Sequence, residues 1–147
     1  MYRRVSILLL LLSFCFVLSN NRVRAEEKPN VSIFDVKQEK VVKVVPLTSE
    51  LQDSVLELLR SSPILYGGFS MDPQDGMVLH VPFPTPVQIK HELYPSAIQE
   101  VYIFLEQDKQ PRALIFFAAK QRPIVVVLSY DARKFMERNQ LKGAWNS

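Results

Sequence analysis

EVYIFLEQDKQPRALIFFAAKQRPIVVVLS, residues 100–129, is the stretch of sequence that decides the fold. It holds three apolar runs, at residues 100–106, 112–118 and 124–129, that are rich in β-branched and aromatic side chains. Runs of this length and composition are typical of β-strands. Because short polar segments separate them, we expect the three runs to form an antiparallel meander.

Apolar side chains occupy both faces of this expected meander. Successive side chains of a strand point to opposite faces, so Val101 and Ile103 face one way and Tyr102 and Phe104 the other. A sheet with one solvated face would instead alternate apolar and polar residues. Both faces therefore need cover, and we take six apolar residues as the candidate interaction surface. They are Tyr102, Phe104, Ile115, Phe117, Val126 and Phe83.

Two helices complete the predicted fold. In residues 50–61 apolar side chains recur at the spacing of one helix face, and Thr48 or Ser49 can accept a hydrogen bond from the first free backbone N–H groups. Ser129 or Asp131 is a similar cap for a helix over residues 131–141. The predicted class is therefore α+β, a small antiparallel sheet, the C-terminal three-strand meander, packed with one central amphipathic helix and a short C-terminal helix.

Further strand signals lie outside the meander. Two β-branched runs, residues 31–36 and 40–45, predict a hairpin, and residues 77–81 predict another strand. In residues 82–86 (PFPTP) every second residue lacks an N–H group, so we expect an edge or surface segment rather than a central strand.

The central helix can cover only one face of the meander. The sequence leaves four candidates for the second face: the C-terminal helix, the proline segment at residues 82–86, a second subunit, or a bound apolar ligand. Soluble monomers seldom leave several large apolar side chains uncovered in one patch. The second face is therefore the strongest functional lead in the sequence.

The N-terminal segment predicts export. A short basic start precedes an uncharged apolar run at residues 5–18, which is typical of a signal peptide. We expect residues 1–25 to be cleaved between Ala25 and Glu26, which leaves residues 26–147 as a single exported α+β domain, secreted or held in the cell envelope. The alternative is an uncleaved single-pass anchor, since the uncharged stretch is just long enough to span a bilayer. Only in that case would the chain contact the membrane.

Charge and cysteine content exclude several classes of function. Residues 1–25 carry four basic residues and no acidic one, so residues 26–147 carry 14 basic and 15 acidic residues. This near-neutral domain offers no concentrated positive face for phosphate, and we expect no nucleic-acid partner. Cys15 is the only cysteine, so the predicted mature chain has no disulfide or thiolate chemistry. Asn30 begins a glycosylation sequon, which matters only where the source modifies asparagine.

His80 and His91 are the only histidines, and a hairpin turning midway between them would place them opposite each other. Two imidazoles fall short of the three or four protein ligands of a stable zinc site. We therefore predict no metal, cofactor or catalytic residue. The predicted function is that of a small exported non-catalytic interaction or accessory protein, which self-associates or binds a protein partner through an apolar sheet face. The alternatives are an apolar-ligand carrier and a hydrolase with a cleft near His80 and His91.

Overall fold

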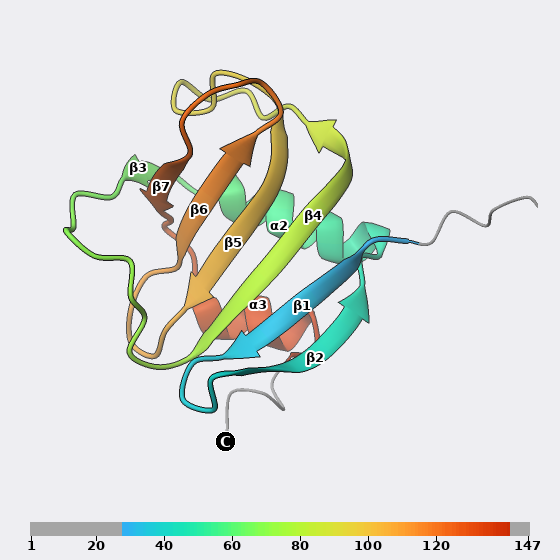
Figure 1. Cartoon of the computed structure of the whole chain (residues 1–147), viewed down its shortest axis with the longest axis vertical. Coiled ribbons are helices and arrows are strands. Elements are labelled where there is room, and N and C mark those ends of the chain that lie inside the picture. The colour runs from blue at the N-terminus through green and yellow to red at the C-terminus, as the bar shows by residue number, and fades with distance from the viewer. Residues whose placement is uncertain (1–27, 142–147) are drawn as a thin grey trace, which may run out of the picture.

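The computed structural model describes residues 28–141, in which seven strands form one antiparallel sheet with two helices. In chain order the elements are β1 (Asn30–Asp35), β2 (Lys40–Pro46), α2 (Ser49–Leu59), β3 (Ile64–Leu65), β4 (Met77–Val87), β5 (Ile98–Leu105), β6 (Arg112–Phe117), β7 (Ile124–Val127) and α3 (Ala132–Arg138). Across the sheet the strands follow the order β2-β1-β4-β5-β6-β7-β3 (Figure 1).

The predicted three-strand meander packed with a central helix is wrong as a description of this fold. The three runs do form β5, β6 and β7, which pair in that order, but they are only part of a seven-stranded sheet. The β1–β2 hairpin joins the sheet because β1 pairs with β4, with Ser32 opposite His80. At the other edge β3 pairs with β7. These pairings join residues far apart in the sequence, so no local pattern reveals them.

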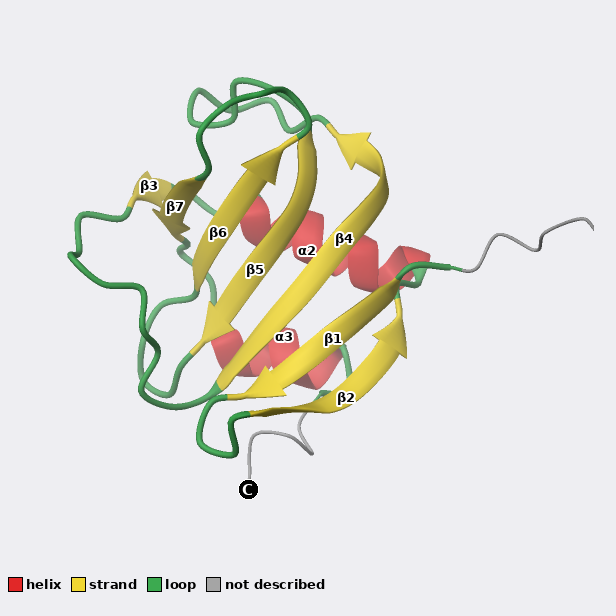
Figure 2. Ribbon diagram, viewed as in Figure 1, coloured by secondary structure: helices red, strands yellow, loops and turns green. Residues whose placement is uncertain are grey.

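Both helices lie behind the sheet, against the same face (Figure 2). The Thr48 hydroxyl accepts a hydrogen bond from the Leu51 N–H at 3.2 Å at the start of α2, and Asp131 caps α3 in the same way. The helices and the inward side chains of the strands form one fully buried core, and burial of each large apolar side chain stabilises the fold by about 1.5–3 kcal/mol. Central members of this core are Ile33, Val55, Leu58, Leu79, Ile103, Ile115 and Phe135.

This arrangement leaves the other face of the sheet without a helix. The helix α3 lies on the same side as α2, so it does not provide the second cover that the sequence suggested. The proline segment belongs to the sheet itself, as the second half of β4. Pairing of β4 with β1 stops at His80, so Pro82, Pro84 and Pro86 lie where that side of β4 has no partner strand. The edge position expected for the prolines is therefore confirmed.

The predicted signal peptide, residues 1–25, lies outside the described residues. Within residues 28–141 no helix combines the length and the apolar character needed to cross a membrane. The helix α2 is 11 residues long and α3 is seven residues long.

Candidate interaction surface

The sheet face turned away from α2 and α3, called the outer face, is lined by apolar and aromatic side chains. Cross-strand pairs define its members, because residues directly opposite each other point to the same face. His80 pairs with Tyr102, and Tyr102 pairs with Leu114. The outer-face residues used below are half-buried and are Phe34, Val78, Tyr102, Leu114, Phe116 and Val125.

The six residues of the predicted interaction surface divide between the two faces. Tyr102 and Phe104 lie on the outer face, as does Leu114, which the prediction omitted. The other four point inward and belong to the core. They are Ile115, Phe117, Val126 and Phe83, none of them more than 6% exposed. The sequence shows that both faces are apolar, but only the register and the position of the helices show which residues share a face.

Three rings form a connected group at the centre of the outer face. The His80 ring stacks on Tyr102 with centroids 4.5 Å apart and planes at 14°, and Tyr102 meets the edge of Phe116 at 5.9 Å. His80 Nε2 lies 2.7 Å from Glu100 Oε2, and both side chains are about one third exposed. Burial raises the pKa of the Tyr102 hydroxyl, and the negative charge of Glu100 raises it further. This tyrosine therefore stays neutral near pH 7, and the face is aromatic with one hydrogen-bonded His80–Glu100 contact.

Next to this group the outer face is hollowed. The hollow has a volume of about 440 Å³ and is lined mainly by apolar side chains contributed by strands β1, β2, β4 and β5. Its apolar lining comprises Phe34, Val41, Val78, Tyr102, Phe104 and Pro73. Pro73 comes from residues 66–76, the connecting loop between β3 and β4. The hollow is large enough for an aromatic side chain and offers it apolar contacts on several sides.

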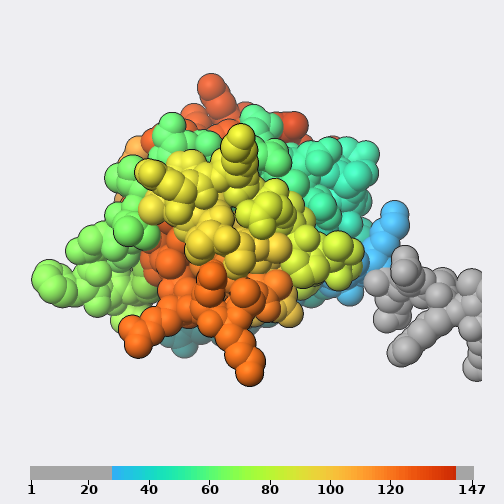
Figure 3. Space-filling view, turned by 90° about the horizontal axis from the view of Figure 1, so that it is seen from above, coloured from blue at the N-terminus to red at the C-terminus, as the bar shows by residue number. Residues whose placement is uncertain are grey.

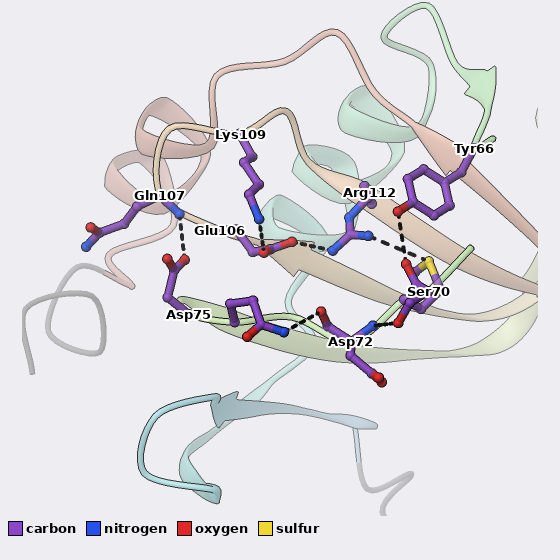
Figure 4. A network of polar contacts seen from close by, with 10 residues as sticks. Tyr66, Ser70, Asp72, Asp75, Glu106, Gln107, Lys109 and Arg112 are labelled. Atoms are coloured by element: carbon purple, nitrogen blue, oxygen red, sulfur yellow. Dashed lines mark hydrogen bonds and ion pairs between the residues drawn. The ribbon is translucent and has the colours of Figure 1, made fainter. Parts of the chain in front are cut away.

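Arg112 fastens the connecting loop to the outer face. Its guanidinium lies over the Tyr66 ring at 5.0 Å and over the Phe104 ring at 5.6 Å, and its Nη1 is 4.0 Å from Met71 Sδ. It also donates to the Glu106 carboxylate, as Figure 4 shows. Tyr66 and Met71 belong to the connecting loop, whereas Phe104 lines the hollow. The loop and the hollow are therefore neighbours, joined through one side chain.

Glu106 is a buried carboxylate that this network keeps charged. It is 2% exposed, and it accepts hydrogen bonds from Arg112 and from Lys109 Nζ, the latter at 2.7 Å. Burial by itself raises its pKa, but the hydrogen bonds and charges of Lys109 and Arg112 outweigh burial and hold the pKa below the usual 4.5. Glu106 is thus ionised near pH 7, and its geometry is that of a structural ion pair rather than of a general acid.

The two histidines do not form a common site. No hairpin turns between them, because β4 continues to Val87. His80 contacts Glu100 and Tyr102, whereas His91 Nδ1 accepts the Leu93 N–H and its ring tilts against Tyr94. In the part of the chain that the structure describes, no three histidine, cysteine or acidic side chains are grouped so that they could hold a metal. The predicted cleft between the histidines therefore has no geometric basis.

Sequence reasoning missed several exposed apolar residues. Phe69, in the connecting loop, is fully exposed, Val41 in the lining of the hollow is 52% exposed, and Ile64 and Leu65 of the opposite edge strand β3 are each about 60% exposed. The local signal for Phe69 is its position after Gly67 and Gly68 in a polar stretch, where no strand or helix pattern would bury it.

Comparison of the chain with known protein families, with curated proteins and with solved structures finds no match in any of the three. The functional argument therefore depends on the chemistry of the outer face. That face combines an aromatic surface, an apolar hollow and internally paired charges.

Proposed function

We propose that this protein is a small exported, non-catalytic binding protein that holds a protein partner on its outer face. One observation carries the proposal: neither helix covers the outer face, and its apolar surface extends over several neighbouring strands. Monomeric soluble proteins rarely expose contiguous apolar patches beyond a few hundred Å², and larger patches mark interaction sites. Binding would remove these side chains from water, which is the main driving force of most protein association.

The shape and chemistry of the face favour a protein over a small molecule. Ligand pockets usually enclose most of their ligand, whereas this hollow opens onto a sheet surface that continues to Leu114, Phe116 and Val125. Aromatic side chains are enriched at the centres of protein interfaces because they bury a large area with few rotatable bonds. Glu106 is paired with the Arg112 guanidinium, so a partner would not have to desolvate an unpaired charge there, and the Glu100 carboxylate has a hydrogen-bond partner in His80.

Site-specific photo-crosslinking in cells tests this proposal on the full-length chain. A photoreactive p-benzoyl-phenylalanine replaces Phe116 on the outer face in one variant and Asp53, on the exposed side of α2, in the matched control. We expect position 116 to give a discrete crosslinked protein that position 53 does not give. The same products from both positions, or none from position 116, would contradict the proposal.

Export is the second part of the proposal and has its own test. The apolar run at residues 5–18 supports it, together with the small residue Ala25 before the expected cleavage point. We expect N-terminal sequencing of the protein recovered outside the cytoplasm to begin at Glu26. Recovery in the membrane fraction with residues 1–25 intact would instead show the single-pass anchor.

A further inference from the structure

Phe69 is an aromatic side chain that the described residues 28–141 leave unburied. It lies in the connecting loop and is fully exposed, and it is the only aromatic among the exposed large apolar side chains of the described region. A phenylalanine has about 150–250 Å² of surface to bury. In the space-filling view, the loop projects at one side of the molecule as a green lobe (Figure 3). Phe69 is therefore a projecting side chain, a knob, for which residues 28–141 provide no socket.

The apolar hollow is a socket of matching chemistry on the same side of the molecule. Pro73, four residues after Phe69, lines the hollow, and Arg112 contacts both Tyr66 in the loop and Phe104 in the hollow. When one surface carries both a knob and its socket, two copies related by a two-fold axis can exchange them reciprocally. Such a contact closes at two copies and leaves neither group open.

A stable contact between two copies needs more area than Phe69 supplies, so it must extend over the outer face. Two reciprocal phenylalanines supply about 300–500 Å², whereas specific interfaces bury at least about 1,200 Å² in total. Ile64, about 60% exposed on β3 beside the loop, adds apolar area on this face because it pairs with Val127, and the outer-face residues Leu114 and Phe116 add more. The knob alone is therefore insufficient, and the contact must include the outer face.

We infer that the partner is a second copy of this chain, and that Phe69 of each copy occupies the apolar hollow of the other. This inference rests on the proposed function, because it names the protein that the outer face binds. It assigns Phe69 as the anchor residue and the hollow around Val78 as its binding site.

Chemical crosslinking of two differently tagged full-length chains tests the pairing. With Cys15→Ser in both chains, one copy carries Ser70→Cys, next to Phe69 on the exposed loop, and the other carries Val78→Cys, so that Phe69 is kept in both copies. A flexible bismaleimide joins thiols that lie close together, and we expect a mixed dimer that carries both tags. The matched control pairs Ser70→Cys with Asp53→Cys on α2 and should give none. Equal yields from both pairs, or no mixed dimer with Val78→Cys, would overturn the inference.

A second variant separates this inference from the proposed function. Phe69→Ala removes only an exposed side chain, so the fold stays intact, and we expect co-purification of the two tagged copies to need at least tenfold higher protein concentration. If Phe69→Ala leaves that concentration unchanged while position 116 crosslinks to a different protein, the inference fails and the proposed function stands. If position 116 crosslinks to no protein, both fail. A small molecule found in the hollow of the purified protein would also overturn the inference.

Discussion

The Glu106–Arg112 ion pair provides the sharpest test of the packing beneath the connecting loop. Arg112→Met removes the guanidinium that lies over the Tyr66 and Phe104 rings but keeps much of the apolar stem of the side chain. Glu106 then stays almost wholly buried, at 2% exposed, with Lys109 as its remaining basic partner. The variant therefore measures how much stability is lost when the buried Glu106 carboxylate no longer has the Arg112 cation, the more buried of its two basic partners.

The structure sets the expected size of this effect. Removing one partner of a buried ion pair costs about 3–5 kcal/mol, because the remaining charge is left without compensation. The Lys109 side chain is 54% exposed, so it compensates only part of the charge, and we expect Arg112→Met to lower the free energy of unfolding by about 3 kcal/mol. Glu106→Leu combined with Arg112→Met leaves no buried charge, and we expect it to cost about 1 kcal/mol or less.

Urea denaturation of the predicted mature chain, residues 26–147, followed by circular dichroism measures these differences. Lys109→Ala is the control, because its half-exposed pair with Glu106 is worth about 1 kcal/mol or less. The slope of the free energy of unfolding against urea concentration should be unchanged, which shows that each variant exposes the same amount of surface on unfolding. A loss below about 1 kcal/mol for Arg112→Met, or a double variant as unstable as the single one, would refute the reasoning.

Three further predictions concern single groups. The folded-state pKa of Glu106 is lowered from 4.5, so its ionised form stabilises the fold fully above pH 4.5, and this stabilisation is lost as the pH falls through the folded-state pKa. Acid titration should therefore destabilise the wild type more than the Glu106→Leu, Arg112→Met variant. Tyr94→Phe should cost about 1–2 kcal/mol in urea denaturation, since it removes the buried hydroxyl that donates to the Leu59 carbonyl at 2.8 Å. Gly76→Ala should lower the free energy of unfolding by about 3 kcal/mol or more, measured by thermal unfolding, because φ is +79° and the new Cβ would lie 2.0 Å from Leu105 O. The control Gly67→Ala meets no atom within 4 Å and should be nearly neutral.

Local patterns in the sequence were sufficient for most of the elements, though not for β3 (Ile64–Leu65), and they were not sufficient for the assembly of the sheet. The apolar spacing of residues 50–61 and the caps at Thr48 and Asp131 correspond to the observed α2 and α3. The pairing of β1 with β4 is different, because it depends on contacts between residues such as Ser32 and His80 that no periodicity connects. The sequence therefore predicted the strands of the N-terminal hairpin and missed the sheet that they join.

The candidate site was only partly predictable for a related reason. Tyr102 and Ile103 are both large and apolar, so the sequence offers no polar residue to mark which of them faces water. The position of both helices on one side decides this, and it places Tyr102 outside and Ile115 inside. Phe69 escaped prediction because its exposure follows from the path of the connecting loop, which the sequence pattern does not determine.

The edges of the sheet give an independent reason to look for the contact on its outer face. The edge strand β2 carries Lys40, Lys43 and Pro46, and a β-bulge interrupts its pairing with β1. The opposite edge, β3, is only two residues long. Lysines, proline, bulges and short strands are the features that discourage strand addition at an edge. On the outer face, in contrast, Arg112 is paired with Glu106 and Glu100 hydrogen-bonds His80, both within the chain. Two copies would therefore pack face to face around the hollow rather than extend one continuous sheet.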